Sequence, residues 1–385
     1  MRIVHTSDWH AGRLWKSVNR LPELGAVLDN LADFLVRERV DLLLMSGDVF
    51  DSAGPSAEAE RMVFSFFRRI GSSGVHSVVI AGNHDHPARM EAWGTLAELV
   101  GVRSVGLPRR REDGGLIEIE SSSGERAQIA AVPFASVGRL VSAIDVTADA
   151  SIAAQEYADG MQRILEHLAG GFRPDAIRLI VAHTHLANAI LAGSERRVHI
   201  GEEWAMMPQA IPATAQYVAL GHIHRHQKVE AAAPTFYAGS PLQLDFGEVG
   251  EIKQFLLLEA ASHLPVRIEA IPYQGGVPLN DVSGTLEEIE RDAERHRSSG
   301  HLRVKVLLPA RDPDIARKVR QLLPNAVVVN ADLPRDEQAP DIDRPAPGAP
   351  PRELYAAYHR KEHRREAEAQ LLTAFDDLRD LVVKE

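Results

Sequence analysis

The sequence of 385 residues contains no cysteine. Disulfide bonds and thiolate-bound metal sites are therefore excluded, and any metal ion must be held by His, Asp, Glu, Asn or water. Ligands of this kind suit manganese, magnesium, iron or zinc. The absence of cysteine thus narrows the chemistry open to a metal site without indicating whether there is one.

Long apolar runs and an excess of positive charge are also missing. No run reaches the roughly 18 apolar residues that a membrane helix needs, and the first residues are typical of a buried strand rather than a signal peptide. The formal net charge of −11 argues against a generally basic surface for nucleic acid. It still permits a local basic groove or a phosphate held by metal. We expect a cytoplasmic protein with no membrane association.

The chain does contain a regular alternation of strand and helix patterns. Residues 2–6, 41–45 and 76–80 predict strands, and residues 21–39 and 56–71 predict the helices between them. A long helix and six further strands are predicted at 151–168 and near 127–132, 178–182, 217–220, 235–238, 254–258 and 266–271. This order predicts the α/β class, with a two-sheet sandwich flanked by helices.

The composition changes after residue 272, which predicts further parts of the chain. We expect the sandwich to occupy residues 1–272 and a small α+β domain to occupy residues 273–335. In the small domain we expect helices at 285–297 and 313–322 and strands at 302–307 and 326–330. Residues 336–352 are rich in proline and charge, as in a linker. Residues 353–385 predict a charged helix that docks on a partner, because an isolated apolar stripe gains little unless it packs on something. That stripe consists of Leu371, Phe375, Leu378 and Val382.

Five predicted strands run directly into side chains that can bind metal. In α/β folds, ligands bind beyond the carboxyl ends of the strands, so these segments are expected to meet at one edge. Two ions held roughly 3.5–4 Å apart can bind both the attacking water and the phosphate oxygens in hydrolysis. The strand-end motifs are Asp8-Trp9-His10, Gly47-Asp48, Gly82-Asn83-His84-Asp85, His183-Thr184-His185 and Gly221-His222-Ile223-His224.

The spacing within these motifs has a physical reading. Residues two apart point the same way in extended backbone, which applies to Asp8 with His10 and to His222 with His224. The carboxylate of Asp48 can bridge two cations, and Asn83 offers a neutral carbonyl oxygen. Each motif alone is weak evidence for a metal site, and Asp48 and Asn83, which follow glycines, are also typical of turns. Their joint occurrence at strand ends indicates a metal site.

Three neighbouring residues have less direct roles. We expect His84 to act catalytically, by protonating a leaving oxygen or stabilising the charged transition state. We expect Asp85 to orient His84, and Asp51 to hold its own loop rather than contact a metal ion. His183 and His185 are both candidates for the fourth motif, and His183 is preferred because it directly ends its strand.

These motifs resemble the five motifs of calcineurin-like metallophosphoesterases. The segments 219–224 and 237–248, and Ser194-Glu195-Arg196, are similar to the SbcD family of nuclease subunits. The resemblance is clearest over residues 1–250, and counting back from Ser194 favours His183 as the ligand. It implies one ion bound by Asp8, His10, Asp48 and His224, and another bound by Asp48, Asn83, His183 and His222.

The resemblance also implies an activity and partners. Members of this family favour manganese, with magnesium as an alternative. They cut DNA ends in the 3′-to-5′ direction and nick hairpins or blocked ends together with an SbcC-type ATPase, in the processing of double-strand breaks. The small domain is then expected to cap the nuclease cleft and the C-terminal helix to dock on the ATPase. A homodimer within a heterotetramer is expected.

Several basic residues of the sequence are candidates for contacts with DNA. Arg13 and Lys16 follow the first motif and could bind phosphates, and Trp15 between them could lie on a sugar or base. Other candidate phosphate contacts are Arg89, Arg225, Lys228 and the run Arg109-Arg110-Arg111.

Two other functions are compatible with the sequence. A phosphatase or cyclic-nucleotide phosphodiesterase could use the same fold and metals, and a purely structural subunit of an ATPase complex is a third hypothesis.

Overall fold

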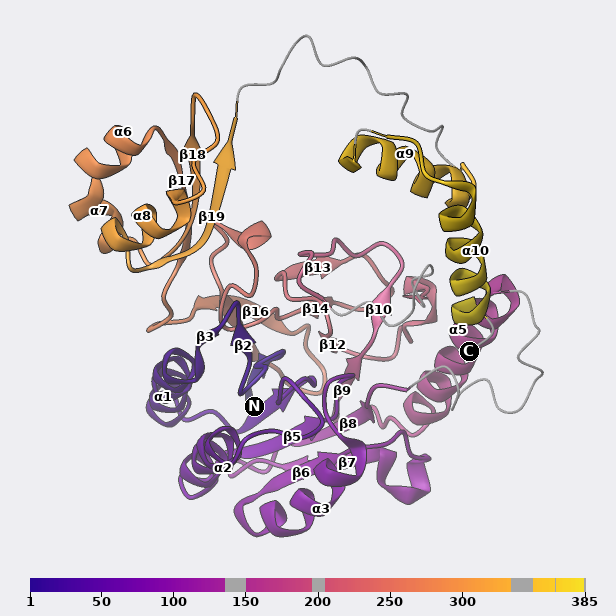
Figure 1. The fold of residues 1–385 in the computed structure, drawn as a ribbon. Helices are drawn as coiled ribbons and strands as arrows, with labels where there is room; N and C mark the ends of the chain where they lie inside the picture. The colour runs from indigo at the N-terminus through magenta and orange to yellow at the C-terminus, as the bar shows by residue number, and fades with distance from the viewer. Residues whose placement is uncertain (136–149, 196–204, 334–348, 364, 384–385) are drawn as a thin grey trace. The chain divides into compact units, whose positions relative to one another are not determined.

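The computed structural model describes residues 1–135, 150–195, 205–333, 349–363 and 365–383 (Figure 1). These residues form two compact units, each described here by itself. The first unit comprises Met1–Leu307 and Pro313–Ala331, and the second comprises Leu308–Asp312 and Asp332–Glu385. Within the described residues, no helix is long and apolar enough to cross a membrane.

The larger unit is built on two six-stranded sheets. The first sheet has the order β16-β15-β1-β4-β5-β6, in which β1, β4, β5 and β6 are parallel and β15 and β16 are antiparallel to their neighbours. Parallel strands place their carboxyl ends at one edge, which is where the motifs lie. The strands are β1 (Arg2–Thr6), β4 (Leu42–Met45), β5 (His76–Ile80), β6 (Val102–Val105), β15 (Gln254–Glu259) and β16 (Arg267–Pro272).

The second sheet has the order β13-β14-β12-β9-β8-β7. Its four central strands are parallel, and the two edge strands, β7 and β13, pair in the antiparallel sense. The strands are β7 (Leu116–Glu120), β8 (Arg126–Val132), β9 (Ile177–His183), β12 (Tyr217–Gly221), β13 (Gln227–Val229) and β14 (Thr235–Tyr237).

The two sheets pack face to face through a dry core. Ile3, Leu44 and Ile80 of the first sheet and Ile129 and Val181 of the second have no exposed surface and belong to one cluster. Alternate residues of the same strands face outward into other clusters, as the period of two in a strand requires. The predicted two-sheet sandwich is confirmed.

Helices cover the outer faces of both sheets. On the first sheet, the helices α1 (Leu21–Arg37) and α2 (Ala57–Gly71) present apolar stripes to the core, together with α3 (Pro87–Ala97). On the second sheet, α5 (Ala150–Ala169) does the same. Helix α2 begins at Ser56, whose hydroxyl accepts the N–H of Ala59 as an N-cap.

Short elements complete the sandwich. Strands β2 and β3 form a short antiparallel hairpin, and β10 and β11 pair in parallel. Their bounds, with those of four short helices, are β2 (Leu14–Trp15), β3 (Val18–Asn19), β10 (His185–Leu186), β11 (Ala205–Met206), η1 (Glu98–Val100), η2 (Arg111–Gly115), η3 (Pro208–Ala210) and η4 (Phe246–Glu248).

The small α+β module has three strands, one of which the sequence did not predict. The unpredicted strand β17 (Leu279–Gly284) pairs in parallel with β18 (His301–Leu307), and β19 (Ala326–Asp332) lies on the other side of β18. The helix expected over 285–297 is two helices, because the chain turns at Asp292. The module's helices are α6 (Leu286–Arg291), α7 (Ala293–Arg297) and α8 (Ile315–Leu322).

Most of this module belongs to the same compact unit as the sandwich. Trp15, Phe246 and Leu279 are buried together in one cluster, and the Arg303 guanidinium lies 5.0 Å over the Phe246 ring. His301 Nε2 lies 2.6 Å from a carboxylate oxygen of Glu23. The module is therefore anchored to the loop that follows β1 and to the segment around η4.

The second unit holds two helices where one was expected. Helix α9 (Pro351–His363) and helix α10 (Ala369–Val383) are separate, and the rings of Tyr355 and Phe375 stack with centroids 4.4 Å apart. Arg352 forms an ion pair with Asp376 across the pair. The expected linker lies mostly outside the described residues, as does the side chain of Val382.

Candidate metal centre

The predicted ligands lie where five parallel strands end. Strands β1, β4 and β5 lead into Asp8 and His10, Asp48 and Asn83, respectively. The other sheet contributes through β9 and β12, whose last residues, His183 and Gly221, are paired across the sheet. The sandwich therefore brings both sets of strand ends to one edge.

The backbone at four of the seven expected ligands is left-handed rather than extended. The φ angles are 53° at Asp8, 47° at His10, 52° at Asp48 and 105° at His222. The expectation that Asp8 and His10 converge through extended backbone was therefore wrong. The conformation is held by N–H bonds from Asp8 to the Gly47 carbonyl and from His10 to the Asp48 carbonyl, both 3.0 Å. Such local strain is common at functional sites.

Two of the motif glycines are required by close packing. A Cβ at Gly82 would overlap the carboxylate of Asp48, and a Cβ at Gly221 would overlap the Ser46 carbonyl. Any side chain at either position would push the loops apart, so glycine at these positions is what allows the strand ends to meet.

The first group of donors comprises Asp8, His10 and His224. One donor atom from each lies within 4.8 Å of the others, and the Nε2 atoms of His10 and His224 are 3.0 Å apart. Bonds of about 2.1 Å to a shared cation, made at roughly right angles, place two nitrogens about 3 Å apart. The spacing of these imidazoles therefore fits one ion.

The second group comprises Asp8, Asp48 and His183, with Asn83 and His222 beside it. The Asn83 carbonyl oxygen lies 2.9 Å from His183 Nε2 and 3.1 Å from His222 Nδ1. The Oδ2 atom of Asp48 lies 3.6 Å from an Nε2 atom in each group, that of His10 and that of His183. Asp48 thus stands between the groups, as a bridging carboxylate must.

The protonation of these buried groups also fits divalent cations. Burial lowers the pKa of His10, His183 and His224, and it lowers that of His222 to about 3, so the imidazoles are neutral and able to bind metal. Burial raises the pKa of Asp8, and the neighbouring carboxylate of Asp48 raises it further. Two buried carboxylates side by side call for positive charge, which a cation would supply.

Three of the candidate ligand imidazoles have an oxygen atom facing their other ring nitrogen. His183 Nδ1 lies 2.9 Å from the Ser46 carbonyl and therefore carries the proton. His10 Nδ1 lies 3.2 Å from a carboxylate oxygen of Asp51, which thus faces a ligand besides holding its loop. His224 Nδ1 lies 2.6 Å from the hydroxyl of Ser194. Partners of this kind fix the ring and its tautomer.

Asp85 does not orient His84, which itself lies among the donors. One ring nitrogen of His84 lies within 4.8 Å of donor atoms of His10 and Asp48. The His84 ring centroid is 4.7 Å from that of His10, and its Nδ1 lies 2.8 Å from the carbonyl oxygen of Asp51. Asp85 instead accepts backbone N–H bonds from Val49, Phe50 and Gly82 at 2.9–3.1 Å. Asp85 therefore joins the β4 and β5 loops, and burial raises its pKa to about 7.

The alternative histidines occupy other places. His185 belongs to none of the donor groups found among the described residues, and its ring centroid is 6.3 Å from that of His222. His5 is a core residue, with its ring nitrogens 2.8 Å from the Tyr217 hydroxyl and 2.9 Å from the Ser46 hydroxyl. The geometry thus favours His183 as the ligand.

The suggested role of Trp15 in binding a sugar or base is contradicted. Positive φ angles at Lys16 and Ser17 turn the short hairpin so that Trp15 is 4 % exposed and packs against Phe246, whereas Leu14 is 68 % exposed. The suggested phosphate contacts Arg89, Arg225 and Lys228 lie beside the carboxylates of Glu60, Glu251 and Glu230.

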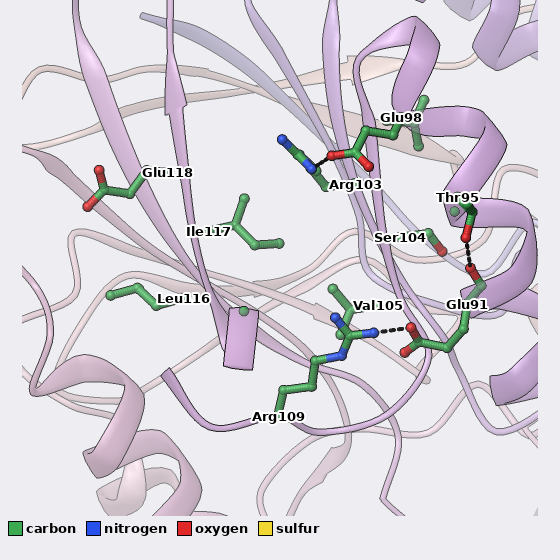
Figure 2. A pocket seen from close by; sticks show the side chains of 13 residues that line it. Glu91, Thr95, Glu98, Arg103, Ser104, Val105, Arg109, Leu116, Ile117 and Glu118 are labelled. Carbon is green, nitrogen blue, oxygen red and sulfur yellow. Dashed lines mark hydrogen bonds and ion pairs between the residues drawn. The ribbon is translucent and has the colours of Figure 1, made fainter. Parts of the chain in front are cut away.

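A hollow away from the metal centre shows no comparable chemistry. It measures about 380 Å³ and lies beside α3 and the edge strands β6 and β7 (Figure 2). Arg103 pairs there with Glu98, and Arg109 pairs with Glu91. None of its lining residues is among the predicted ligands.

Three residues near the centre were not assigned roles from the sequence. Ser46 contacts His183 through its carbonyl, Glu248 contacts Ser194, and Lys253 reaches the His224 carbonyl at 3.0 Å. Their partners are distant in sequence, so no local pattern pointed to these contacts.

Comparisons with known proteins agree with this geometry. The calcineurin-like phosphoesterase family model matches residues 1–226. The chain is 33% identical over 282 residues to the SbcD subunit of the SbcCD nuclease of Bacillus subtilis, covering 72% of this chain and 71% of that one. It is 31% identical to the same subunit from Rhodobacter capsulatus, covering 78% of each chain. The Escherichia coli protein is 28% identical, covering 84% of this chain and 82% of that one. The chain therefore belongs to the calcineurin-like phosphoesterases and, within them, to the SbcD family of nuclease subunits.

Proposed function

We propose that this protein is a DNA nuclease subunit that hydrolyses phosphodiester bonds with two divalent metal ions. The observation that carries the proposal is the position of Asp48, whose Oδ2 lies 3.6 Å from an imidazole nitrogen of each donor group. One shared carboxylate between two ligand sets is the arrangement that two-metal hydrolysis needs.

The ligands divide between two ions that share Asp48. The first set contains Asp8, His10, Asp48 and His224, and the second contains Asp48, Asn83, His183 and His222. When bound, such ions lower the pKa of a coordinated water and polarise the phosphate oxygens.

His84 is proposed to handle the proton of the leaving group. Its Nδ1 faces the Asp51 carbonyl and therefore keeps a proton there, which leaves Nε2 for the substrate. In the imidazolium form, Nε2 can donate to the leaving oxygen or to the charged phosphate. Its backbone N–H donates to Asp48 Oδ1 at 2.9 Å, so the loop that carries it is tied to the bridging carboxylate.

The metal is proposed to be manganese, with magnesium as the alternative. A set of carboxylate, amide and imidazole ligands without thiolate suits a cation between the hard and the borderline classes. The measurement is metal content after reconstitution of the stripped protein with each ion, followed by cleavage assays at matched occupancy. Full activity with zinc alone would contradict the assignment.

We also propose how the chain assembles. The small module, residues 273–335, caps the cleft, and α9 and α10, reached through the linker 336–352, dock on an SbcC-type ATPase. Exposed apolar side chains support the docking, since Leu371 is 38 % and Leu378 is 64 % exposed.

A homodimer is proposed through α2 and α3. The rings of Phe64 and Trp93 stack with centroids 5.5 Å apart, and beside them on α3 and η1 Leu96 and Leu99 are 72 % and 84 % exposed. An exposed apolar patch of this kind marks an interaction surface. Together with the ATPase, this dimer would form a heterotetramer.

The testing experiment measures cleavage by the purified protein, with and without the ATPase, on end-blocked duplex DNA and on hairpins. We expect metal-dependent nicking and 3′-to-5′ removal of nucleotides. The rival function, a phosphatase or cyclic-nucleotide phosphodiesterase, is tested on small phosphomonoesters and cyclic nucleotides in the same buffer. A clear preference for those small substrates over DNA would refute the nuclease proposal.

A further inference from the structure

A chain of polar contacts leads away from the metal ligand His224 into the protein interior. His224 Nδ1 lies 2.6 Å from the Ser194 hydroxyl, and that hydroxyl donates to Glu248 Oε1 at 2.5 Å. Oε2 of Glu248 lies 2.5 Å from the Lys253 ammonium. Glu248 has no exposed surface, and the Lys253 side chain is 8 % exposed, so the ion pair between them is shielded from water.

The number of protons available in this series of polar contacts fixes the tautomer of His224. A serine hydroxyl has one proton, and the carboxylate of Glu248 has none to give, so the Ser194 proton points at Glu248. The Ser194 oxygen must then accept a proton from His224 Nδ1. The lone pair of the imidazole is consequently on Nε2, the atom that lies 3.0 Å from His10 Nε2 in the first donor group.

Further bonds hold each member of the chain in place. The N–H of Leu244 donates to Glu248 Oε2 at 3.1 Å, and Lys253 also donates to the His224 carbonyl at 3.0 Å. The backbone N–H of His224 donates to Glu195 at 3.1 Å. The ligand is thus held at its backbone and at its ring.

The same network reaches the small module. Gln243 donates from Nε2 to the Glu248 carbonyl at 2.9 Å, and its Oε1 accepts the N–H of Leu279, the first residue of β17, at 2.6 Å. The segment that contains Glu248 therefore contacts both a metal ligand and the module.

We propose that Ser194 and Glu248 are positioning residues that hold His224 in the Nδ1–H tautomer and so present its Nε2 to one of the two ions. This inference rests on the proposed metal function. Lys253 balances the charge of Glu248. Neither Ser194 nor Glu248 touches the reacting atoms, so both act through His224 alone.

The two ion sites should respond differently when the polar contacts from His224 through Ser194 to Glu248 are broken. His183, in the other set, is oriented by the backbone carbonyl of Ser46, which no side-chain substitution removes. Partners of this type typically change metal affinity by about 10–100-fold. Substitution of Ser194 should therefore lower the affinity of the protein for one ion and leave its affinity for the other unchanged.

The experiment titrates the metal-free full-length protein with Mn²⁺ by calorimetry, using Ser194→Ala, Ser194→Thr, Glu248→Gln and the control Glu251→Gln. Glu251 also contacts Lys253, at 3.3 Å, and so matches the loss of a carboxylate without breaking the chain. We expect Ser194→Ala and Glu248→Gln to lower the affinity of one of two sites about 10–100-fold. Ser194→Thr, which keeps the hydroxyl, should restore it, and the control should bind as the unaltered protein does.

A second measurement separates positioning from general stability. Nitrogen NMR of the histidine rings in the metal-free protein should show the proton of His224 on Nδ1, and Ser194→Ala should shift His224 toward a mixture of tautomers. Thermal unfolding of metal-free Ser194→Ala should match that of Glu251→Gln.

Two results would overturn the inference: unchanged affinities in Ser194→Ala, or equal weakening of both sites together with early unfolding. Should the unaltered protein bind fewer than two ions, the proposed function fails, and the His224 tautomer in the metal-free protein still decides the role of Ser194 and Glu248.

Discussion

At the scale of single residues, Asp48 is the most constrained part of the site. Its φ angle of 52° is left-handed, one carboxylate oxygen accepts the N–H of His84, and the other faces His10 and His183. Asn has the shape of Asp and tolerates a left-handed backbone, but it lacks the negative charge that two cations require.

Asp48→Asn is therefore expected to abolish cleavage while leaving the fold intact. The amide keeps the size and tolerates the positive φ angle, but it removes the negative charge shared by both ions. Metal content should fall from two equivalents toward one or none, measured by elemental analysis beside a DNA cleavage assay. Asp29→Asn, at an exposed carboxylate, is the control. Cleavage at an undiminished rate would refute the bridging role.

His5 allows a prediction about pH that is independent of the metal. Burial lowers its pKa to about 3 from an ordinary value of 6.5, so the unfolded chain binds the proton more readily than the folded chain. Between these values, folding stability should fall as pH falls, by up to about 1.4 kcal/mol per pH unit from this one group. Above about pH 6.5 the contribution is constant.

The measurement is the free energy of unfolding of metal-free protein in urea at pH 7 and pH 5. His5→Asn should be less stable at pH 7, because it loses the contacts to Tyr217 and Ser46, but its loss of stability between the two pH values should be smaller. An identical pH dependence in the variant and the unaltered protein would show that His5 does not contribute.

At the scale of elements, the hairpin of β2 and β3 joins the metal-binding loop to the small module. Trp15 on this hairpin is buried against Phe246 and Leu279. The sequence predicted neither this contact nor strand β17, because Leu279-Asn280-Asp281 has little apolar alternation and pairs with residues that follow a helix. The break between α9 and α10 was missed for a related reason, since charged residues around 364–368 are compatible with helix.

Trp15→Ala should loosen the small module and destabilise the protein by about 3–5 kcal/mol, the usual cost of removing a large buried aromatic side chain. Hydrogen exchange should rise first in β17 and β18, while β4 and β5 stay protected. Leu14→Ala, at the exposed neighbour, should change little. Uniform exchange across all strands in the Trp15 variant would contradict this coupling.

At the scale of the whole molecule, the net charge of −11 indicates that the protein surface does not by itself supply most of the attraction for DNA. The candidate contacts Arg89, Arg225 and Lys228 each form an ion pair with a carboxylate, so their charges are partly neutralised. The metal ions and the proposed ATPase partner would then supply much of the attraction for phosphate.

Leu378→Asp is expected to weaken binding of the ATPase without changing metal content or cleavage by the isolated subunit. Leu378 is 64 % exposed, so the change should leave α10 folded. Pull-down with the ATPase and cleavage by the subunit alone measure the two effects, with Gln370→Asp on the same helix as the control for added charge. Binding at full strength would refute docking through this face.

The sequence by itself determined which residues could bind metal and that they lie at strand ends, because hydrophobic periodicity and glycine-flanked motifs are local signals. Only the tertiary structure decided how they meet. The left-handed backbone at Asp8 and His10, the bonding of Asp85 to loop amides and the burial of Trp15 depend on contacts between distant segments. The link from His224 through Ser194 to Glu248 likewise joins segments that are far apart in sequence, which no local pattern encodes.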